Sequence, residues 1–333
     1  MNEPDPHRAH VDDDADEPTR DAVVIGGGAA GLSAALLLAR ARLRVAVVDA
    51  GSPRNAPAAH MQGYLSRDGL APGELLATGR AEVVAYGGEL VDGTVQAALP
   101  GFRVRLTDGR VLRARRLLVA TGLRDELPDV PGVASRWGRD VLQCPYCHGH
   151  EVRDQALGVL ATGPASVHQA LLVSQWSRDV VLFEHTYSLS EVEREQVSAL
   201  DIRIVSGEVT GLVVGEDGLS AVRATDAVVP RTALFVFPRF VAGTGALTEL
   251  GCETDEGGYL VVDATGATTT PGVWAAGNVV NPRAQVITAA GAAAAAAMAM
   301  HQDLVREHVQ RAVETKRHSP GAPDSSSTAA GRR

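Results

Sequence analysis

Hydrophobic and polar positions near the start of the chain follow the order strand, turn, helix, strand. Residues 21–25 form a short apolar run, residues 26–31 a glycine-rich turn, residues 32–40 an amphipathic stretch, and residues 44–49 a second apolar run that ends in an acid. Short apolar runs between turn residues are typical of buried strands, and apolar positions at helical spacing are typical of a packed helix. The pattern predicts a βαβ unit.

Between residues 89 and 122 the pattern changes to alternation of apolar and polar positions. Residues 102–106 and 111–119 alternate in this way, and Asp108-Gly109 stands between them. This dipeptide is a strong signal for a hairpin turn. A β-meander is therefore predicted after the first unit.

A second βαβ-like unit is predicted over residues 157–184. An apolar strand there meets a Thr-Gly-Pro turn, a helix runs to about Ser177, and residues 180–183 form another strand. Short strands and turns are expected over residues 242–278, and the high alanine content of residues 285–314 predicts a helix. The chain is thus expected to be an α/β protein with two nucleotide-sized units.

The charge balance of the chain bears on its partners. Its 333 residues include 31 Lys or Arg and 40 Asp or Glu, for a formal net charge of -9. An acidic chain is poorly suited to polyanions, so no nucleic acid partner is expected. Lys316 is the single lysine, which excludes a P-loop lysine or a Schiff-base lysine in the core.

Both ends of the chain are predicted to be disordered tails. Residues 1–20 carry an excess of acids, and residues 316–333 are mostly Ser, Pro, Ala and Gly with terminal arginines, compositions that do not build a core. No targeting segment is recognisable, and the long apolar run at residues 286–300 is mostly alanine and too short for a bilayer. We therefore expect a cytoplasmic protein without membrane contact.

The glycine turn of the first unit carries a dinucleotide-binding motif. The spacing G-x-G-x-x-G follows a strand, opens a helix and is followed by an acid about 20 residues later, as in a Rossmann fingerprint. The glycines let backbone amides approach a pyrophosphate, and the acid accepts ribose hydroxyls. This spacing does not choose FAD over NAD. The candidate cofactor-binding residues of this motif are Gly26, Gly28, Ala29, Ala30, Gly31 and Asp49.

Two later segments favour FAD by resemblance. Residues 114–122 read as a strand that ends in Ala-Thr-Gly, and residues 270–278 as a strand that ends in Gly-Asn. Both resemble flavoproteins with two dinucleotide-binding domains, in which the second segment gives its last residue to the ribityl chain. Those proteins carry Asp at that place, whereas Asn keeps one acceptor oxygen and loses the charge. The resemblance adds Asn55, Thr121, Gly122, Gly277, Asn278, Gln285 and Val286 to the candidate FAD site.

Cys144-Pro145-Tyr146-Cys147-His148 admits four interpretations. The c-type haem motif needs export, and no signal peptide is recognisable. A zinc site lacks a distant second pair of ligands, so no metal is expected. A glutaredoxin motif belongs near the start of a thioredoxin fold. The remaining interpretation is a redox-active dithiol that faces a flavin, with His148 tuning a thiol or taking its proton. Cys252 is interpreted as structural.

The order of these motifs resembles the low-molecular-weight thioredoxin reductases over about residues 21–312. The stretch Cys-Pro-Tyr-Cys-His-Gly is most similar to the branch that includes the dithiol oxidases of gliotoxin and holomycin biosynthesis. The resemblance implies a discontinuous FAD-binding domain, residues 21–126 and 241–315, with a second domain, residues 127–240, inserted in it. It also implies a homodimer, a flavin-facing Cys147, and a Cys144 that forms the mixed disulfide with substrate.

The second unit departs from the thioredoxin reductase pattern at its nucleotide site. The G-x-G-x-x-A turn of those enzymes becomes Ala161 to Ser166, and their His-Arg-Arg cluster becomes Glu184-His185-Thr186, with no arginine until Arg194. A carboxylate without a cationic partner would repel the 2′-phosphate of NADPH but can accept ribose hydroxyls. NADPH is therefore disfavoured, whereas NADH and no nucleotide at all stay open.

Three functions follow from these alternatives. The first is an FAD-dependent dithiol oxidase that uses the Cys144–Cys147 pair, a small dithiol substrate and dioxygen. The second is an NAD(P)H-dependent reductase of a thioredoxin-like protein. The third is a flavin-bound redox sensor whose tails contact a partner.

Overall fold

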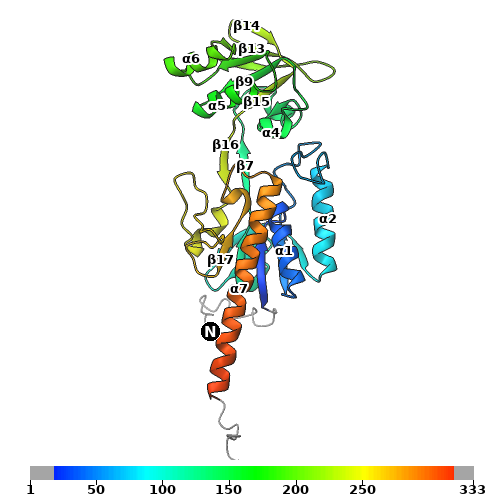
Figure 1. Cartoon of the computed structure of the whole chain (residues 1–333), viewed down its shortest axis with the longest axis vertical. Coiled ribbons are helices and arrows are strands. Elements are labelled where there is room, and N and C mark those ends of the chain that lie inside the picture. Colours follow the sequence, from blue (N-terminus) through cyan, green and yellow to red (C-terminus); the bar gives the residue numbers. More distant parts are fainter. Residues whose placement is uncertain (1–18, 319–333) are drawn as a thin grey trace, which may run out of the picture.

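The computed structural model describes residues 19–318, which form two α/β units joined by a pair of strands (Figure 1). The predicted tails therefore lie mostly outside the described residues. Two of their boundaries are corrected, because β1 begins at Arg20 and the last helix, α7, continues to His318. Residues 316–318 were assigned to the tail from composition, but they extend the regular hydrogen bonding of that helix.

The first unit is built on a parallel sheet in the order β3, β2, β1, β6, β17. Alternate residues of its strands face two apolar clusters. One cluster holds Ala22 and Val24 with helices α1 and α7, and the other holds Val23 and Ile25 with the meander. The bounds are β1 Arg20–Ile25, α1 Ala29–Arg40, β2 Val45–Asp49, α2 Pro72–Ala85, β3 Glu89–Asp92, β6 Val111–Val119, β17 Val273–Ala275 and α7 Val286–His318.

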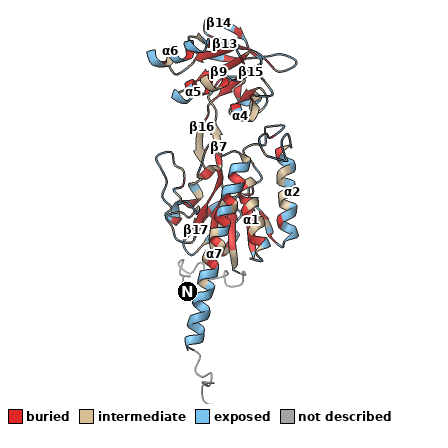
Figure 2. Ribbon diagram, viewed as in Figure 1, coloured by how far each residue is buried: buried red, intermediate tan, exposed pale blue. Residues whose placement is uncertain are grey.

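Alanine explains how α1 and α7 pack so closely on one face of this sheet. The buried side of α7 carries Ala289, Ala293 and Ala296, and α1 presents Ala34 and Ala35 to the same cluster. Small side chains let two helix backbones approach each other and the sheet. In Figure 2 the later turns of α7 leave this packing and are exposed.

The predicted meander is present as β4, β5 and β6, which pair antiparallel in sequence order. The hairpin between β5 and β6 turns at Gly109, whose φ of +93° favours glycine. A short 3-10 helix, η1, packs beside it. The bounds are β4 Val95–Leu99, β5 Arg103–Leu106 and η1 Gly245–Leu250.

The second unit has its own parallel sheet, in the order β11, β10, β9, β15, β8, and a small antiparallel sheet of β12, β13 and β14. Helix α5 ends at Val173, four residues before the predicted end, and a turn follows. The bounds are α3 Val133–Arg136, β8 Val141–Leu142, α4 Pro145–His148, β9 Leu157–Ala161, α5 Pro164–Val173, β10 Val180–Glu184, α6 Glu191–Ala199, β11 Arg203–Val205, β12 Val209–Val214, β13 Leu219–Ala224, β14 Ala227–Pro230 and β15 Ala233–Val236.

Two antiparallel strands, β7 Leu123–Glu126 and β16 Arg239–Ala242, carry the chain out to the second unit and back again (Figure 1). The second unit is therefore inserted in the first. This confirms the predicted fold class of two dinucleotide-binding units with a β-meander.

Candidate functional site

A cavity of about 1040 Å³ is lined by residues of both units and brings the predicted site together. It lies at the carboxyl ends of β1 and β2, which is where open α/β sheets bind their ligands. Of the predicted site residues, Gly31 alone is absent from the lining. The predicted residues that do line it are Gly26, Gly28, Ala29, Ala30, Asp49, Asn55, Thr121, Gly122, Cys144, Cys147, His148, Gly277, Asn278, Gln285 and Val286.

The glycines of the first turn have different tasks. A Cβ on Gly26, whose φ is +109°, would lie 2.3 Å from Ala120 O, so only glycine fits there. A Cβ on Gly31 would lie 1.8 Å from Gly26 O, so Gly31 serves the packing of α1 on the turn. A Cβ on Gly28 would meet nothing within 4 Å. Gly28 therefore leaves open the space that a ligand would occupy.

The start of α1 fits the pyrophosphate of FAD. Gly28 is its N-cap and provides no side-chain hydrogen bond, and the first turn carries no acid. The first N–H groups of an α-helix have no acceptor within the helix, and the helix dipole adds partial positive charge there. An anion at this end of the cavity would satisfy both.

Asp49 lies at the end of β2, where the acid of a dinucleotide-binding unit is expected. Its Oδ1 accepts from Gly51 N at 3.2 Å, and its Oδ2 pairs with Arg80 of α2. A Cβ on Gly27 would lie 2.5 Å from the Asp49 carboxyl carbon. Sequence reasoning missed Gly27, although three successive glycines were a signal for it. For Arg80 there was no signal, because α2 was not predicted.

Thr121 supplies a buried polar atom that needs a partner. Its Oγ1 makes no hydrogen bond to any described residue, and Thr121 lines the cavity. A buried hydroxyl without a partner costs free energy, so a polar ligand group beside it would be stabilising. Together with the glycine turn and Asp49, this atom fits FAD, which would supply two-electron redox chemistry when bound.

The two cysteines of the motif form a disulfide at the start of the short helix α4. The N–H of Cys147 donates to Cys144 O at 3.1 Å. Gln169 of α5 donates to Gln143 O at 2.6 Å and so holds the residue before the pair. Across the cavity, Gln285 Nε2 lies 4.0 Å from Cys147 Sγ. The contact with the first unit is therefore made by the sulfur that was predicted to face the flavin.

His148 is half-buried and lines the same cavity. Burial lowers the pKa of its imidazole below the ordinary value of 6.5, and the negative charge of Glu151 opposes this only in part. The ring is therefore neutral at pH 7. Of the two roles that the sequence left open, a neutral imidazole fits the acceptance of a proton.

An exposed aromatic surface lies beside the disulfide. Tyr146, between the two cysteines, is 66% exposed, lines the cavity and packs edge-on against Trp176 at a centroid distance of 5.7 Å. Sequence reasoning gave neither residue a role.

Cys252 lies away from the cavity lining, packs against the core of the first unit, and has its sulfur 3.6 Å from Thr268 Oγ1. This agrees with a structural cysteine.

The acid at the nucleotide position of the second unit is bonded to neighbouring groups, as Asp49 is in the first unit. Glu184 at the end of β10 accepts from Leu189 N at 3.2 Å and from Ser206 Oγ at 2.7 Å, and it pairs with Arg194. The prediction that no arginine offsets its charge is wrong, because α6 brings Arg194 back to it. The oxygens of Glu184 are thus already engaged and its charge is balanced.

The turn of the second unit is closed in a similar way. Ser166 is fully buried, and its Oγ accepts from Thr162 N at 3.1 Å. Pro164 at the start of α5 removes a further N–H. In a dinucleotide-binding turn these amides face the pyrophosphate. Here one amide has an internal partner and another is missing.

Membrane-spanning helices and clusters of metal-binding side chains are both absent from residues 19–318. No helix in this part of the chain is long and apolar enough to cross a membrane. Within the same residues, no three His, Cys, Asp or Glu side chains gather in a way that could hold a metal ion.

The fold and the site define a class of protein: an FAD-type disulfide oxidoreductase with two dinucleotide-binding units and a redox cysteine pair between them. The chain belongs to the pyridine nucleotide-disulphide oxidoreductase family, whose profile matches residues 20–297. The resemblance to low-molecular-weight thioredoxin reductases is thereby confirmed.

Individual relatives agree with this assignment. The chain is 29% identical to the thioredoxin reductase sirT of Leptosphaeria maculans over 81% of this chain and 89% of that protein. It is 35% identical to the thioredoxin reductase tcpT of Claviceps purpurea over 60% of this chain and 66% of that protein. The crystal structure of HlmI superposes with a TM-score of 0.87 at 54% identity and covers 89% of this chain and 96% of that one.

Proposed function

We propose that this chain is an FAD-dependent dithiol oxidase in which a small substrate dithiol reduces the Cys144–Cys147 disulfide and dioxygen is the final electron acceptor. Bound FAD would supply the two-electron redox chemistry between the cysteine pair and dioxygen, which takes up two electrons and two protons and leaves as hydrogen peroxide. The substrate leaves as its disulfide. A homodimer in the cytoplasm belongs to the same proposal and rests on the resemblance alone.

Cys144 and Cys147 have different roles in the proposed thiol exchange, because Cys147 Sγ is the sulfur that lies beside Gln285 of the first unit. A substrate thiolate attacks Cys144 Sγ, the intramolecular disulfide breaks, and Cys147 is released as a thiolate beside Gln285. The second substrate thiolate then attacks the substrate sulfur of the mixed disulfide and releases Cys144. Two electrons pass to the cysteine pair, and the two substrate protons go to bases or solvent. His148, neutral at pH 7, is placed to take one of them.

The observation that carries this proposal is the turn of the second unit, in which Ser166 bonds the Thr162 amide and Pro164 removes another N–H, whereas no side chain caps the glycine turn of the first unit. Glu184 is bonded to Arg194, Ser206 and the Leu189 amide, and Ser166 occupies the Thr162 amide. Because Glu184 balances the charge of Arg194, no excess positive charge is available to the 2′-phosphate of NADPH. NADPH is therefore disfavoured as the electron donor, which supports a dithiol in that role, and NADH is compared with both in the titration described below.

The second candidate is an NAD(P)H-dependent reductase of a thioredoxin-like protein. It is supported by the intact βαβ order of the second unit and by relatives named thioredoxin reductase, including one of Streptomyces coelicolor at 30% identity over 84% of this chain. The redox-sensor alternative rests on the tails, which lie largely outside the described residues.

The cysteine assignment is tested by two serine variants of the FAD-loaded protein. Cys147→Ser should abolish flavin reduction by dithiothreitol while FAD stays bound, because the electron path ends at that sulfur. Cys252→Ser, the matched control, should behave as wild type because its sulfur lies outside the cavity. Oxygen consumption and anaerobic flavin absorbance measure both. Loss of turnover in Cys252→Ser with full turnover in Cys147→Ser would contradict the assignment.

A further inference from the structure

The side chain of Asn278 is almost fully engaged by the protein. Its Nδ2 donates to Asn281 O and Ala284 O, each at 3.0 Å, and lies 3.4 Å from Pro282 O. On its other side, Oδ1 accepts from Arg54 Nη1 at 3.4 Å. Three carbonyl oxygens require a donor and a guanidinium requires an acceptor, so these neighbours fix the orientation of the amide.

The hydrogen bonds of Asn278 hold the turn that leads into α7. Residues 281–284 form the turn that leads into this helix, and the Ala284 N–H bonds back to Asn281 O at 3.1 Å. Gln285 comes next and reaches Cys147 Sγ at 4.0 Å. The amide of Asn278 thus pins the turn directly before the residue that contacts the redox sulfur.

Arg54 connects the same amide to the strands between the two units. It forms a two-pronged ion pair with Asp125 of β7, at 2.8 and 2.9 Å, and stacks 4.9 Å from the ring centroid of Phe240 in β16. The side chain of Asp125 is 9% exposed, so this pair is well shielded from solvent. A bidentate pair of this kind is geometrically specific.

We propose that Asn278 is a positioning residue: its amide joins Arg54 and the two linker strands to the start of α7, and so sets Gln285 against Cys147 Sγ. The proposal rests on the proposed function only in taking Cys147 as the sulfur that reduces the flavin. An aspartate carboxylate at position 278 cannot hold the turn in this way. It has no N–H to donate, and it would face three carbonyl oxygens at 3.0 to 3.4 Å.

The test compares Asn278→Asp with Asn281→Asp in the full-length, FAD-loaded protein. Both variants add one negative charge to the same turn. The Asn281 side chain, however, only accepts from Arg283 N at 3.0 Å, which an aspartate does equally well. Under anaerobic conditions, Asn278→Asp should slow the limiting rate of flavin reduction by dithiothreitol about tenfold with an unchanged half-saturating concentration, because substrate meets Cys144. Asn281→Asp should match wild type.

The same substitutions made in Gln285→Ala protein show whether Asn278 acts through Gln285. In Gln285→Ala protein, the effect of Asn278→Asp should shrink to about twofold or less, since contacts within one network are not additive. Asn278→Ala adds no charge and keeps the proposal testable if the aspartate variant does not fold. It should slow reduction by a smaller factor with the same dependence on Gln285.

The affinity for FAD provides a readout that does not depend on thiol chemistry. Fluorescence titration of apoprotein should give the order wild type, Asn278→Ala, Asn278→Asp from tight to weak. If dithiothreitol reduces neither wild type nor any variant, the proposed function fails, and this order still tests the positioning role. The proposal is overturned if Asn278→Asp binds FAD more tightly than wild type, if both aspartate variants behave alike, if Asn278→Ala is indistinguishable from wild type, or if the Asn278 and Gln285 effects simply multiply.

Discussion

At the scale of single residues, the redox chemistry is concentrated in the four-residue helix α4 and the residue before it. Cys144 is the N-cap, Cys147 lies one turn later, and the His148 N–H donates to Cys144 O at 3.2 Å. The short helix thus holds both sulfurs and one imidazole at the cavity wall. The protonation state of that imidazole follows from burial.

The lowered pKa of His148 predicts how the rate of flavin reduction depends on pH. Because the folded pKa is lowered below 6.5, the neutral base persists down to below pH 6.5, and flavin reduction by dithiothreitol should fall as pH drops through the lowered pKa. His148→Gln should be about a hundredfold slower at pH 7 and should lack this acid limb. Ionisation of dithiothreitol affects both proteins equally, so the ratio of their anaerobic rates isolates His148. A ratio of wild-type to His148→Gln rates that does not fall with pH, or that falls with a midpoint above pH 7, would contradict the assignment.

Local motifs made many of the site residues predictable from the sequence. Gly26 and Asp49 could be found because a turn and the strand next to it have a fixed spacing. Arg54 and Arg194 could not, because each acts on a partner that only the fold brings near: Asp125 across the linker, and Glu184 from the following helix. The charge of Glu184 was therefore misjudged.

At the scale of elements, the turn between β1 and α1 contains one glycine that the backbone requires and another that leaves space open in the cavity. Gly26 has a φ of +109° and no room for a Cβ, whereas Gly28 has a φ of -77° and open space beside it. Any L-residue adopts the backbone conformation of Gly28.

Alanine substitutions should distinguish the two positions. Gly28→Ala should keep the thermal stability of the apoprotein but weaken FAD about tenfold, because its methyl group enters the cavity. Gly26→Ala should destabilise the fold by about 4 kcal/mol or more. Gly73→Ala, at a helical position with open space and no cavity contact, is the control and should leave FAD affinity unchanged without loss of stability. Equal FAD affinity in Gly28→Ala and wild type, measured by titration, would count against the FAD site.

The strands were easier to predict than the helices. Buried apolar runs identify β1, β2 and β9 directly, because strands covered on both faces are hydrophobic throughout. Helix α2 has Pro72 and Val83 as its buried residues and so lacks a clear apolar face. The last turns of α7 are polar and exposed, so composition alone assigned them to a tail.

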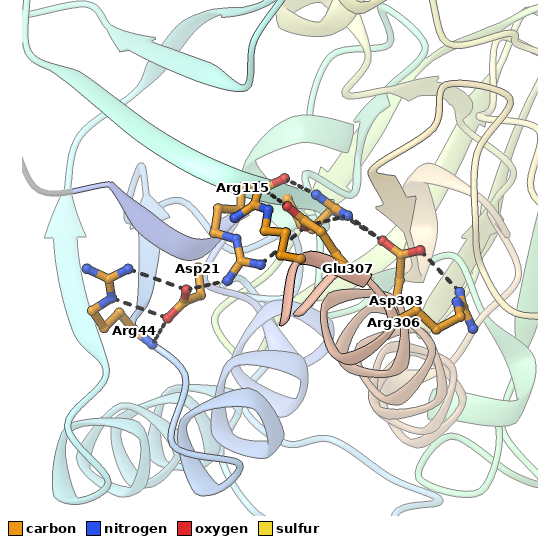
Figure 3. Close-up of polar contacts among 8 residues, drawn as sticks. Asp21, Arg44, Arg115, Asp303, Arg306 and Glu307 are labelled. Carbon is orange, nitrogen blue, oxygen red and sulfur yellow. Dashed lines mark hydrogen bonds and ion pairs between the residues drawn. The ribbon is translucent and has the colours of Figure 1, made fainter. Parts of the chain in front are cut away.

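At the scale of the whole molecule, a network of ion pairs fastens α7 to the sheet at the end opposite the cavity. Figure 3 shows Glu307 of α7 beside Arg115 of β6, Asp303 of α7 beside Arg306, and Asp21 of β1 between Arg44 and Arg115. Asp303 and Glu307 also pair with Arg116 of β6. Burial alone would raise the pKa of Asp303 and Glu307, but the neighbouring arginines outweigh it and lower both.

The lowered pKa values predict how stability depends on pH. Carboxylates with a lowered folded pKa stabilise the protein fully above their unfolded pKa, near 3.8 and 4.5, and this stabilisation is lost as the pH falls through the folded pKa. Asp303→Asn with Glu307→Gln should cost about 1 kcal/mol per carboxylate at pH 7, and this cost should shrink as the pH falls through the lowered pKa values. Urea unfolding measures this, with the exposed-loop variant Glu256→Gln as control. A cost independent of pH would contradict the network.

The direction of electron flow depends on the second unit, which keeps the fold of a nucleotide-binding domain but has a turn in which one amide is bonded internally and another is replaced by proline. The buried Ser166 and the paired Glu184 leave few groups for a pyridine nucleotide. The cysteine pair, in contrast, lines the cavity with Cys147 beside Gln285. The second unit thus places a disulfide in the wall of the cavity that fits FAD.

The most direct test is an anaerobic titration of the FAD-loaded protein, in separate samples, with dithiothreitol, NADH and NADPH while flavin absorbance is followed. We expect dithiothreitol to bleach the flavin within one turnover, air to restore the colour, and NADPH to react slowly or not at all. NADH should be no faster than dithiothreitol. Rapid stoichiometric bleaching by NADPH, with matching reduction of a thioredoxin disulfide, would contradict the oxidase and make this chain a thioredoxin reductase.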